Sequence, residues 1–270
     1  MAYKMIVLDI DDTLIRDDKT ISDRVKDSLK KASEMGVKVV LASGRPTFAM
    51  KHLANELELA KYGSYIISFN GAVVTSCKDN NTLFQKAVKK EDAHKLYKMS
   101  KKYDLYIQTY LDNYIITEEN SAYTEVEAEI TGLEIKIVDD FIKSVDRDVI
   151  KLIMLEEPEK LKKAGDIIAK ELEGEFSVVI SKPFFLEFTD NGIDKAAAIE
   201  VLTKIEGITK DEVIAMGDSY NDLSMIKYAG LGVCMANGKD DVKKEADYIA
   251  PSNEEDGVAY VVEKFVLSAE

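Results

Sequence analysis

The sequence has few cysteines and no long apolar run. Cys77 and Cys234 are its only cysteines, too few for a disulfide framework, and both lie in apolar stretches where a small buried side chain is the default. No segment approaches the roughly 18 consecutive apolar residues of a membrane span. The aspartates within residues 9–12 interrupt what would otherwise be an apolar targeting segment. We therefore expect a soluble, cytoplasmic protein. Histidine is also scarce, and neither His52 nor His94 suggests a role.

Basic residues are outnumbered by acidic ones. The 270 residues carry 50 acidic and 36 basic side chains, a net charge of −14. Such a chain repels the phosphate backbone of nucleic acids and anionic membranes, so neither is an expected partner. The same field would repel a phosphate-bearing substrate, so local cations would be needed at any phosphate site. With 46% hydrophobic residues, the chain can form a sizeable core and is long enough for two domains.

Apolar runs of strand length alternate with helical periodicity in the first part of the chain. Residues 5–8 are followed by a helical pattern from about Ser22, residues 37–42 by another from Pro46, and residues 65–69 form a third apolar run. This alternation predicts an α/β fold with a doubly wound, Rossmann-like parallel sheet. In such sheets, ligands bind beyond the carboxyl ends of the strands.

The pattern changes between about Leu83 and Asp190. Residues 105–117 and 175–189 alternate with period two around short turns, which indicates antiparallel hairpins with one exposed face. Helices are expected at residues 90–103 and 158–172, and the α/β pattern returns at 194–205, 212–216 and 254–266. We therefore predict a core of residues 1–83 and 191–270, and an inserted α+β domain of residues 84–190.

The first apolar run ends in two carboxylates, Asp9 and Asp11, spaced two residues apart. Burying and crowding carboxylates is costly unless a cation or a shared proton compensates for it. This pattern therefore points to a metal, a proton or a phosphate. Taken alone, it is equally typical of an acidic loop that happens to follow a strand.

Three further groups follow in a specific order. Ser43-Gly44-Arg45 ends the second apolar run, Lys195 begins a helical stretch, and residues 217–222 (Gly-Asp-Ser-Tyr-Asn-Asp) follow a later strand. Each has an ordinary explanation by itself, such as a turn, a solvated lysine or a helix cap. Together they place polar groups at three strand ends and one helix start, and one pocket can receive Asp9, Ser43 and Asp218.

The series D-x-D-x-T, S-G-R, Lys195 and G-D-x-x-N-D resembles the four motifs of the haloacid dehalogenase superfamily of phosphohydrolases. The closer resemblance is to the Cof-type bacterial phosphatases, which have a large α+β cap and act on sugar phosphates. It covers nearly the whole chain and includes these further stretches: Ile21-Ser22, Asn70-Gly71-Ala72, Phe185-Leu186-Glu187 and residues 255–259. One departure is Asp12, where the family usually has glycine. Aspartate tolerates turn geometry, but it adds a negative charge beside the site.

The resemblance implies a phosphoric monoester hydrolase that works through an aspartyl-phosphate, with the insert as a cap over the active site. Asp9 would be the nucleophile and Asp11 the general acid and base. The implied cofactor is Mg²⁺, which prefers oxygen ligands and keeps several waters. Its implied ligands are the side chains of Asp9 and Asp218 and the main-chain carbonyl of Asp11.

The remaining roles implied by the resemblance concern the phosphate and its surroundings. The groups expected to hold phosphate are Ser43, the amides of Ile10 and Gly44, Asn221 and Lys195, which is also a catalytic residue. Thr13 is expected to orient the first loop, and Asp222 to support the metal ligands. Arg45, Asn70 and Glu187 are candidates for contacting the substrate, although Glu187 is equally compatible with a structural role at a domain hinge.

Other functions remain open at this point. The nearest is a phosphotransferase or phosphomutase on the same scaffold, in which a sugar hydroxyl takes the place of water. A non-enzymatic phospho-aspartate receiver is disfavoured, because receivers span about 120 residues and lack an acid two places after the phosphorylated aspartate. The expected partner is a small phosphorylated metabolite. The sequence predicts neither the individual ester nor an oligomeric state.

Overall fold

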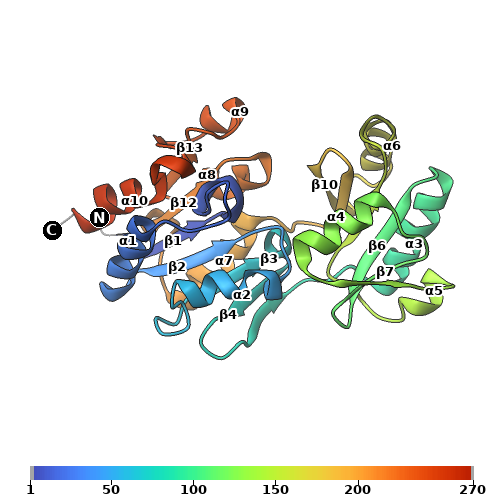
Figure 1. The fold of residues 1–270 in the computed structure, drawn as a ribbon, viewed down its shortest axis with the longest axis horizontal. Coiled ribbons are helices and arrows are strands. Elements are labelled where there is room, and N and C mark those ends of the chain that lie inside the picture. The colour runs from blue at the N-terminus through green and yellow to red at the C-terminus, as the bar shows by residue number, and fades with distance from the viewer. Residues whose placement is uncertain (1–2, 269–270) are drawn as a thin grey trace. The chain divides into compact units, whose positions relative to one another are not determined.

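The computed structural model describes residues 3–268 and divides into two compact units. The first consists of Met1–Phe84 and Asp194–Glu270, and the second, Gln85–Ile193, is inserted within it (Figure 1). These limits lie within three residues of those expected from the sequence. The assignment of the two units as catalytic core and substrate-specificity cap stays a prediction.

The first unit is an α/β layer structure around an eight-stranded sheet, in the order β14-β13-β12-β1-β2-β3-β4-β5. Its strands are β1 Met5–Leu8, β2 Lys38–Ala42, β3 Tyr65–Ser68, β4 Val73–Ser76, β5 Thr82–Gln85, β12 Val213–Gly217, β13 Leu231–Met235 and β14 Tyr248–Ala250. The strands from β14 to β3 pair in parallel, which confirms the predicted fold class. β4 runs antiparallel to β3, because a short turn at residues 69–71 connects them where a parallel pair would need a crossover.

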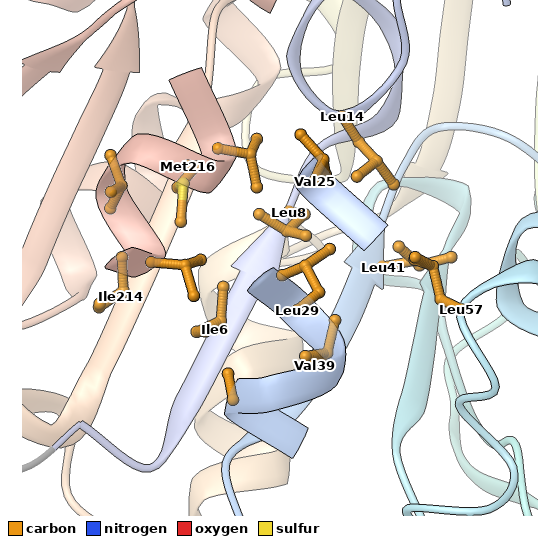
Figure 2. Packing of buried hydrophobic residues seen from close by; sticks show 14 of the residues in the cluster. Ile6, Leu8, Leu14, Val25, Leu29, Val39, Leu41, Leu57, Ile214 and Met216 are labelled. Carbon is orange, nitrogen blue, oxygen red and sulfur yellow. The ribbon is translucent and has the colours of Figure 1, made fainter. Parts of the chain in front are cut away.

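Both faces of this sheet are covered by helices. The helices are α1 Asp23–Glu34, α2 Thr47–Glu56, α7 Lys195–Glu206, α8 Leu223–Tyr228, α9 Asp240–Lys243 and α10 Gly257–Val262. Ile6 and Leu8 of β1 point to the face where α1, α2 and α10 pack, and Figure 2 shows them beside Val25 and Leu29 of α1. The alternate residues of β1 pack against α7 and α8 on the other face. Because both faces are buried, the strands read as continuous apolar runs.

The start of α7 is fixed by a cap and a close backbone contact. The Asp194 side chain accepts a hydrogen bond from the amide of Ala197 at 2.8 Å, as helix N-caps do. Gly71 lies against the Asp194 carbonyl, where an added Cβ would come within 2.1 Å of the oxygen, and its φ is +110°. Only glycine fits this position, and the contact fixes Lys195 in the first turn of the helix.

The second unit is a six-stranded sheet with the order β10-β11-β9-β6-β7-β8. Its elements are α3 Lys90–Lys102, β6 Tyr106–Leu111, β7 Tyr114–Thr117, α4 Ala122–Thr131, β8 Glu134–Ile137, α5 Phe141–Ser144, β9 Leu152–Leu155, α6 Pro158–Glu171, β10 Phe176–Lys182 and β11 Phe185–Asp190. The predicted hairpins β6–β7 and β10–β11 are confirmed. β9 joins them into one sheet, which the sequence pattern did not predict.

The expectation that these hairpins expose one face is wrong for β11, which is buried on both faces, as is the added strand β9. Leu152 and Phe188 pack on one face in a cluster with residues of α3 and α6. On the other face, Ile153 and Phe185 pack with residues of α4, a helix that was not predicted. Within residues 3–268, no helix is both long and apolar enough to cross a membrane.

Candidate active site

Three of the predicted polar groups follow neighbouring parallel strands. Asp9 directly follows β1, Ser43 follows β2 and Asp218 follows β12, and β1 lies between the other two strands. The amide of Asp9 donates to the carbonyl of Met216 at 2.9 Å, which continues the ladder one residue beyond the strand. The three side chains therefore begin at the same edge of the sheet, where ligands bind in this fold class.

Lys195 lies between two carboxylates and is completely buried. Its Nζ is 2.5 Å from Oδ1 of Asp9 and 2.5 Å from Oδ1 of Asp222. The other oxygen of Asp222 accepts the amides of Asp218 and Ser219, each at 3.0 Å. Both oxygens of Asp222 therefore hold Lys195 and the loop after β12, and its role in supporting the metal ligands stays a prediction.

Burial and the neighbouring charges raise the pKa values of two carboxyl groups at this site. Burial, followed by the charge of Asp222, raises the pKa of Asp9 well above its usual range. Burial and Asp222 also raise the pKa of Asp218 to about 7. Burial alone would lower the pKa of Lys195, but Asp222 and Asp9 more than offset this and raise it, so the lysine stays charged. A further cation would lower both carboxyl pKa values.

The carboxylates fit a hard divalent cation. Oxygens of Asp9, Asp218 and Asp222 lie within 4.8 Å of one another, and all three residues are buried. One buried lysine, Lys195, offsets part of the charge of these three acids, so the cluster carries excess negative charge. Oxygen donors of this kind suit Mg²⁺. Asp9 and Asp218 are the better candidates for direct ligands, since Asp222 already uses both oxygens.

The turn between Asp9 and Ile15 places Thr13 against Asp218. The hydroxyl of Thr13 donates to Oδ1 of Asp218 at 3.2 Å, and the amide of Ile15 donates to the carbonyl of Ile10 at 3.0 Å to close the turn. Thr13 thus links the first loop to the loop after β12, and its role in orienting the first loop stays a prediction. Asp12 has the left-handed backbone angles φ 59° and ψ 9°.

The Asp11 carboxylate is held by cations. Nε and Nη2 of Arg45 donate to its two oxygens at 3.0 and 2.7 Å, and Nζ of Lys19 is 3.6 Å from Oδ1. Such a bidentate pair fixes both oxygens. Arg45, which the sequence suggested as a substrate contact, is therefore a partner of the predicted general acid in this structure. Lys19 was not anticipated, because it lies outside all four motifs.

Three of the predicted phosphate-binding residues, Ser43, Gly44 and Asn221, lie close to Asn70. Nδ2 of Asn221 donates to Oδ1 of Asn70 at 3.3 Å, and a Cβ added at Gly44 would come within 3.2 Å of the Asn70 side chain. The amide of Asn70 donates to the carbonyl of Ser43 at 3.0 Å. The loops after β2, β3 and β12 thus meet at this asparagine. Ser43 accepts the amide of Arg45 at 3.2 Å, which fixes the turn.

Glu187 belongs to a buried polar cluster in the second unit. One of its oxygens accepts from Nζ of Lys151 at 3.0 Å and from the hydroxyl of Ser181 at 2.7 Å. Lys151 and Glu187 are both buried, and Tyr110 of the same cluster donates to buried Glu127. The structure thus gives Glu187 several partners within its own unit.

Two asparagines that sequence reasoning missed support the first loop. Nδ2 of Asn237 donates to the carbonyl of Asp12 at 2.7 Å, and Oδ1 of Asn237 accepts the amide of Asn253 at 3.3 Å. Nδ2 of Asn253 donates to the carbonyl of Ile15 at 3.0 Å. Asn237 follows β13 by two residues, so the rule that polar groups gather at strand ends would have found it if β13 had been predicted.

Comparison with known proteins identifies the family of this chain. Residues 6–262 match the family described as haloacid dehalogenase-like hydrolase. The chain is 34% identical to the 5-amino-6-(5-phospho-D-ribitylamino)uracil phosphatase YcsE of Bacillus subtilis, covering 98% of this chain and 96% of the relative. A crystal structure of a haloacid dehalogenase-like hydrolase from Bacteroides thetaiotaomicron is 40% identical, with a TM-score of 0.89 and coverage of 97% and 99%. The chain therefore belongs to the haloacid dehalogenase-like hydrolases of the Cof type, and it is a phosphatase.

Proposed function

We propose that the protein is a Mg²⁺-dependent phosphatase that hydrolyses phosphate monoesters of sugars or sugar alcohols through an aspartyl-phosphate at Asp9. The observation that carries this proposal is the buried Asp9 carboxylate, held by Lys195 next to Asp218. Burying the charged groups of Asp9, Lys195 and Asp218 away from water is costly, so such a cluster marks a candidate functional site. A phosphate with its cation is the ligand that this cluster suits. Lys195, which contacts Asp9 in this structure, would offset charge on the phosphate oxygens.

The reaction divides into two transfers of the phosphoryl group. In the first, a carboxylate oxygen of Asp9 attacks phosphorus, the bond from phosphorus to the ester oxygen breaks, and Asp11 donates a proton to that oxygen. In the second, Asp11 takes a proton from water, the water oxygen bonds to phosphorus, and the bond to Asp9 breaks. Asp11 must leave Arg45 to reach the leaving group, because Arg45 holds both of its oxygens in this structure.

The residues around phosphate would position and neutralise it. The amide of Ile10, Ser43, the amide of Gly44, Asn221 and Lys195 would contact its oxygens, and such contacts supply most of the catalysis in phosphoryl transfer. Mg²⁺ bound by Asp9, Asp218 and the carbonyl of Asp11 would supply further positive charge against the phosphoryl oxygens.

The substrate class rests on relatives and on the inserted unit. YcsE is named for an ester whose phosphate lies on a ribityl group. The protein described here is similar to YcsE over nearly its full length. We propose that the second unit selects the substrate, with Glu187 and its partners Lys151 and Ser181 as the candidate polar contacts. Buried polar groups that are already hydrogen-bonded suit hydroxyl-rich ligands better than apolar ones. The cytoplasmic location stays a prediction.

Phosphate release from a panel of phosphorylated sugars and sugar alcohols tests the proposal. We expect turnover with Mg²⁺ and none with a chelator, and we expect Asp9→Asn to lower turnover by about 10³-fold or more. Transfer of the phosphoryl group to a sugar hydroxyl without free phosphate would favour the phosphotransferase alternative. Near-wild-type turnover by Asp9→Asn would rule out the covalent mechanism.

A further inference from the structure

The turn between β3 and β4 has an unusual backbone. Phe69, Asn70 and Gly71 all have positive φ, at 52°, 55° and 110°. Glycine adopts such angles freely and asparagine tolerates them, but a bulky aromatic residue in this region is an outlier. Left-handed residues of this kind cost energy and persist only where the surrounding contacts hold them, and they cluster at functional sites.

The backbone of this turn is held by the loop after β2. The amide of Phe69 donates to the carbonyl of Arg45 at 3.1 Å, and the amide of Asn70 donates to the carbonyl of Ser43 at 3.0 Å. In the other direction, the amide of Ser43 donates to the carbonyl of Ile67 at 3.0 Å. Two successive amides of the turn thus bind one loop, so the left-handed angles of the turn and the shape of that loop are fixed together.

The side chain of Asn70 lies between two of the predicted phosphate-binding residues. Its Oδ1 accepts from Nδ2 of Asn221 at 3.3 Å. A Cβ added at Gly44 would come within 3.2 Å of both Oδ1 and Nδ2 of Asn70, so the asparagine packs directly against the backbone of Gly44. An asparagine side chain has two N–H donors. One N–H of Asn221 can therefore bind Asn70 while the other donates to an anion.

The last residue of the turn contacts the start of α7. Gly71 lies against the carbonyl of Asp194, the residue before Lys195. The turn therefore contacts the loop after β2, the residue that begins α7 and the loop after β12. These three segments carry three of the four motifs found in the sequence.

We infer that the turn Phe69–Gly71 positions the phosphate-binding groups, and that Asn70 acts within it by orienting the side-chain amide of Asn221 toward the phosphate. This inference rests on the proposed phosphate site. Asn70 is then a positioning residue that contacts neither the phosphate nor the reacting atoms. A direct substrate contact would act independently of Asn221, whereas an orienting contact matters only while Asn221 is present.

Inhibition of phosphate release by vanadate tests this inference in a double-variant cycle. Asn70→Gly removes the acceptor oxygen and keeps the turn, because glycine adopts the left-handed conformation without strain. We expect it to weaken vanadate inhibition by about 3- to 10-fold, as for the loss of one hydrogen bond. Asn221→Ala should weaken inhibition at least as much, and the double variant no further than Asn221→Ala alone. Asn80→Gly makes the same change at an exposed left-handed residue (φ 58°) and should leave inhibition unchanged.

The results separate this inference from the proposed function. Losses that add in the double variant would overturn the inference, because Asn70 and Asn221 would then act independently. An equal loss in Asn80→Gly would also overturn it, as would wild-type inhibition of Asn70→Gly. A lower unfolding temperature of Asn70→Gly with unchanged inhibition would leave the turn a purely structural role. If vanadate does not inhibit the wild type, or inhibits Asn221→Ala equally well, the proposed phosphate site itself is wrong.

Discussion

Replacing Lys195 with methionine removes the only cation that touches both Asp9 and Asp222 within the described residues. The side chain is completely buried and both ion pairs measure 2.5 Å. Lys195→Met leaves these two carboxylates facing each other without their cation. Breaking a buried ion pair in this way costs about 3–5 kcal/mol. For a chain of this size, that corresponds to a fall in unfolding temperature of roughly 6–20 °C.

A loss of stability alone does not show that Lys195 neutralises phosphate, and a double variant separates the two roles. Asp222→Asn removes one facing charge, and its amide oxygen can still accept the amides of Asp218 and Ser219. We expect Lys195→Met/Asp222→Asn to recover much of the stability lost in Lys195→Met. It should not recover turnover or vanadate binding, because both require the positive charge of the lysine.

The measurements are thermal unfolding in a chelator, phosphate release with Mg²⁺, and inhibition by vanadate, each on the wild type, the two single variants and the double variant. If the double variant regained both stability and vanadate affinity, Lys195 would have only a structural role. If Lys195→Met unfolded at the wild-type temperature, the buried ion pairs would not stabilise the fold and the reasoning from burial would be wrong.

Two further predictions concern Asp11 and the carboxyl groups with raised pKa. Asp11→Asn should lower turnover of sugar phosphates by about 10²-fold or more but that of nitrophenyl phosphate much less, because nitrophenolate leaves without a proton; equal losses would mean that Asp11 maintains the site instead. The pKa of Asp218 rises from its ordinary value of 3.8 to about 7 in the folded protein. The metal-free folded state therefore binds more protons than the unfolded state between these values, and this contribution to stability falls as pH rises through that window. A fixed Mg²⁺ concentration should raise the unfolding temperature more at pH 8 than at pH 5. Asp218→Asn should reduce this difference, although the raised pKa of Asp9 also contributes to it. An equal rise at both pH values in the wild type would contradict the assignment.

The sequence predicted the core because its strands are buried on both faces. Continuous apolar runs such as residues 5–8 and 37–42 are hard to misread, and the parallel arrangement then sets Asp9, Ser43 and Asp218 at one edge. β13 contains Gly232 and is as apolar as these, but it was overlooked, and Asn237 was missed with it. In the second unit, β9 has four buried residues without alternation, so the period-two pattern that revealed the hairpins could not find it.

Pairings between side chains followed less readily from the sequence. The motifs identified both Asp11 and Arg45, yet nothing in their spacing indicates that they pair. That contact depends on how the turn after β1 packs against the start of α2, 34 residues away. Similarly, Lys195 was predicted near phosphate, but its double contact with Asp9 and Asp222 joins residues 186 and 27 positions away and follows only from the folded chain.

The pairing of the cations bears on the order in which ligands bind. Lys195, Arg45 and Lys19 are all engaged by carboxylates, and the chain as a whole carries a charge of −14. A phosphate dianion that approaches this site meets cations whose charge is already balanced, together with buried carboxylates in excess. A divalent cation would meet the opposite situation at the proposed metal site, because oxygens of Asp9, Asp218 and Asp222 lie within 4.8 Å of one another. We therefore expect the metal to bind before the substrate, and its charge would then make the same cluster attractive to phosphate.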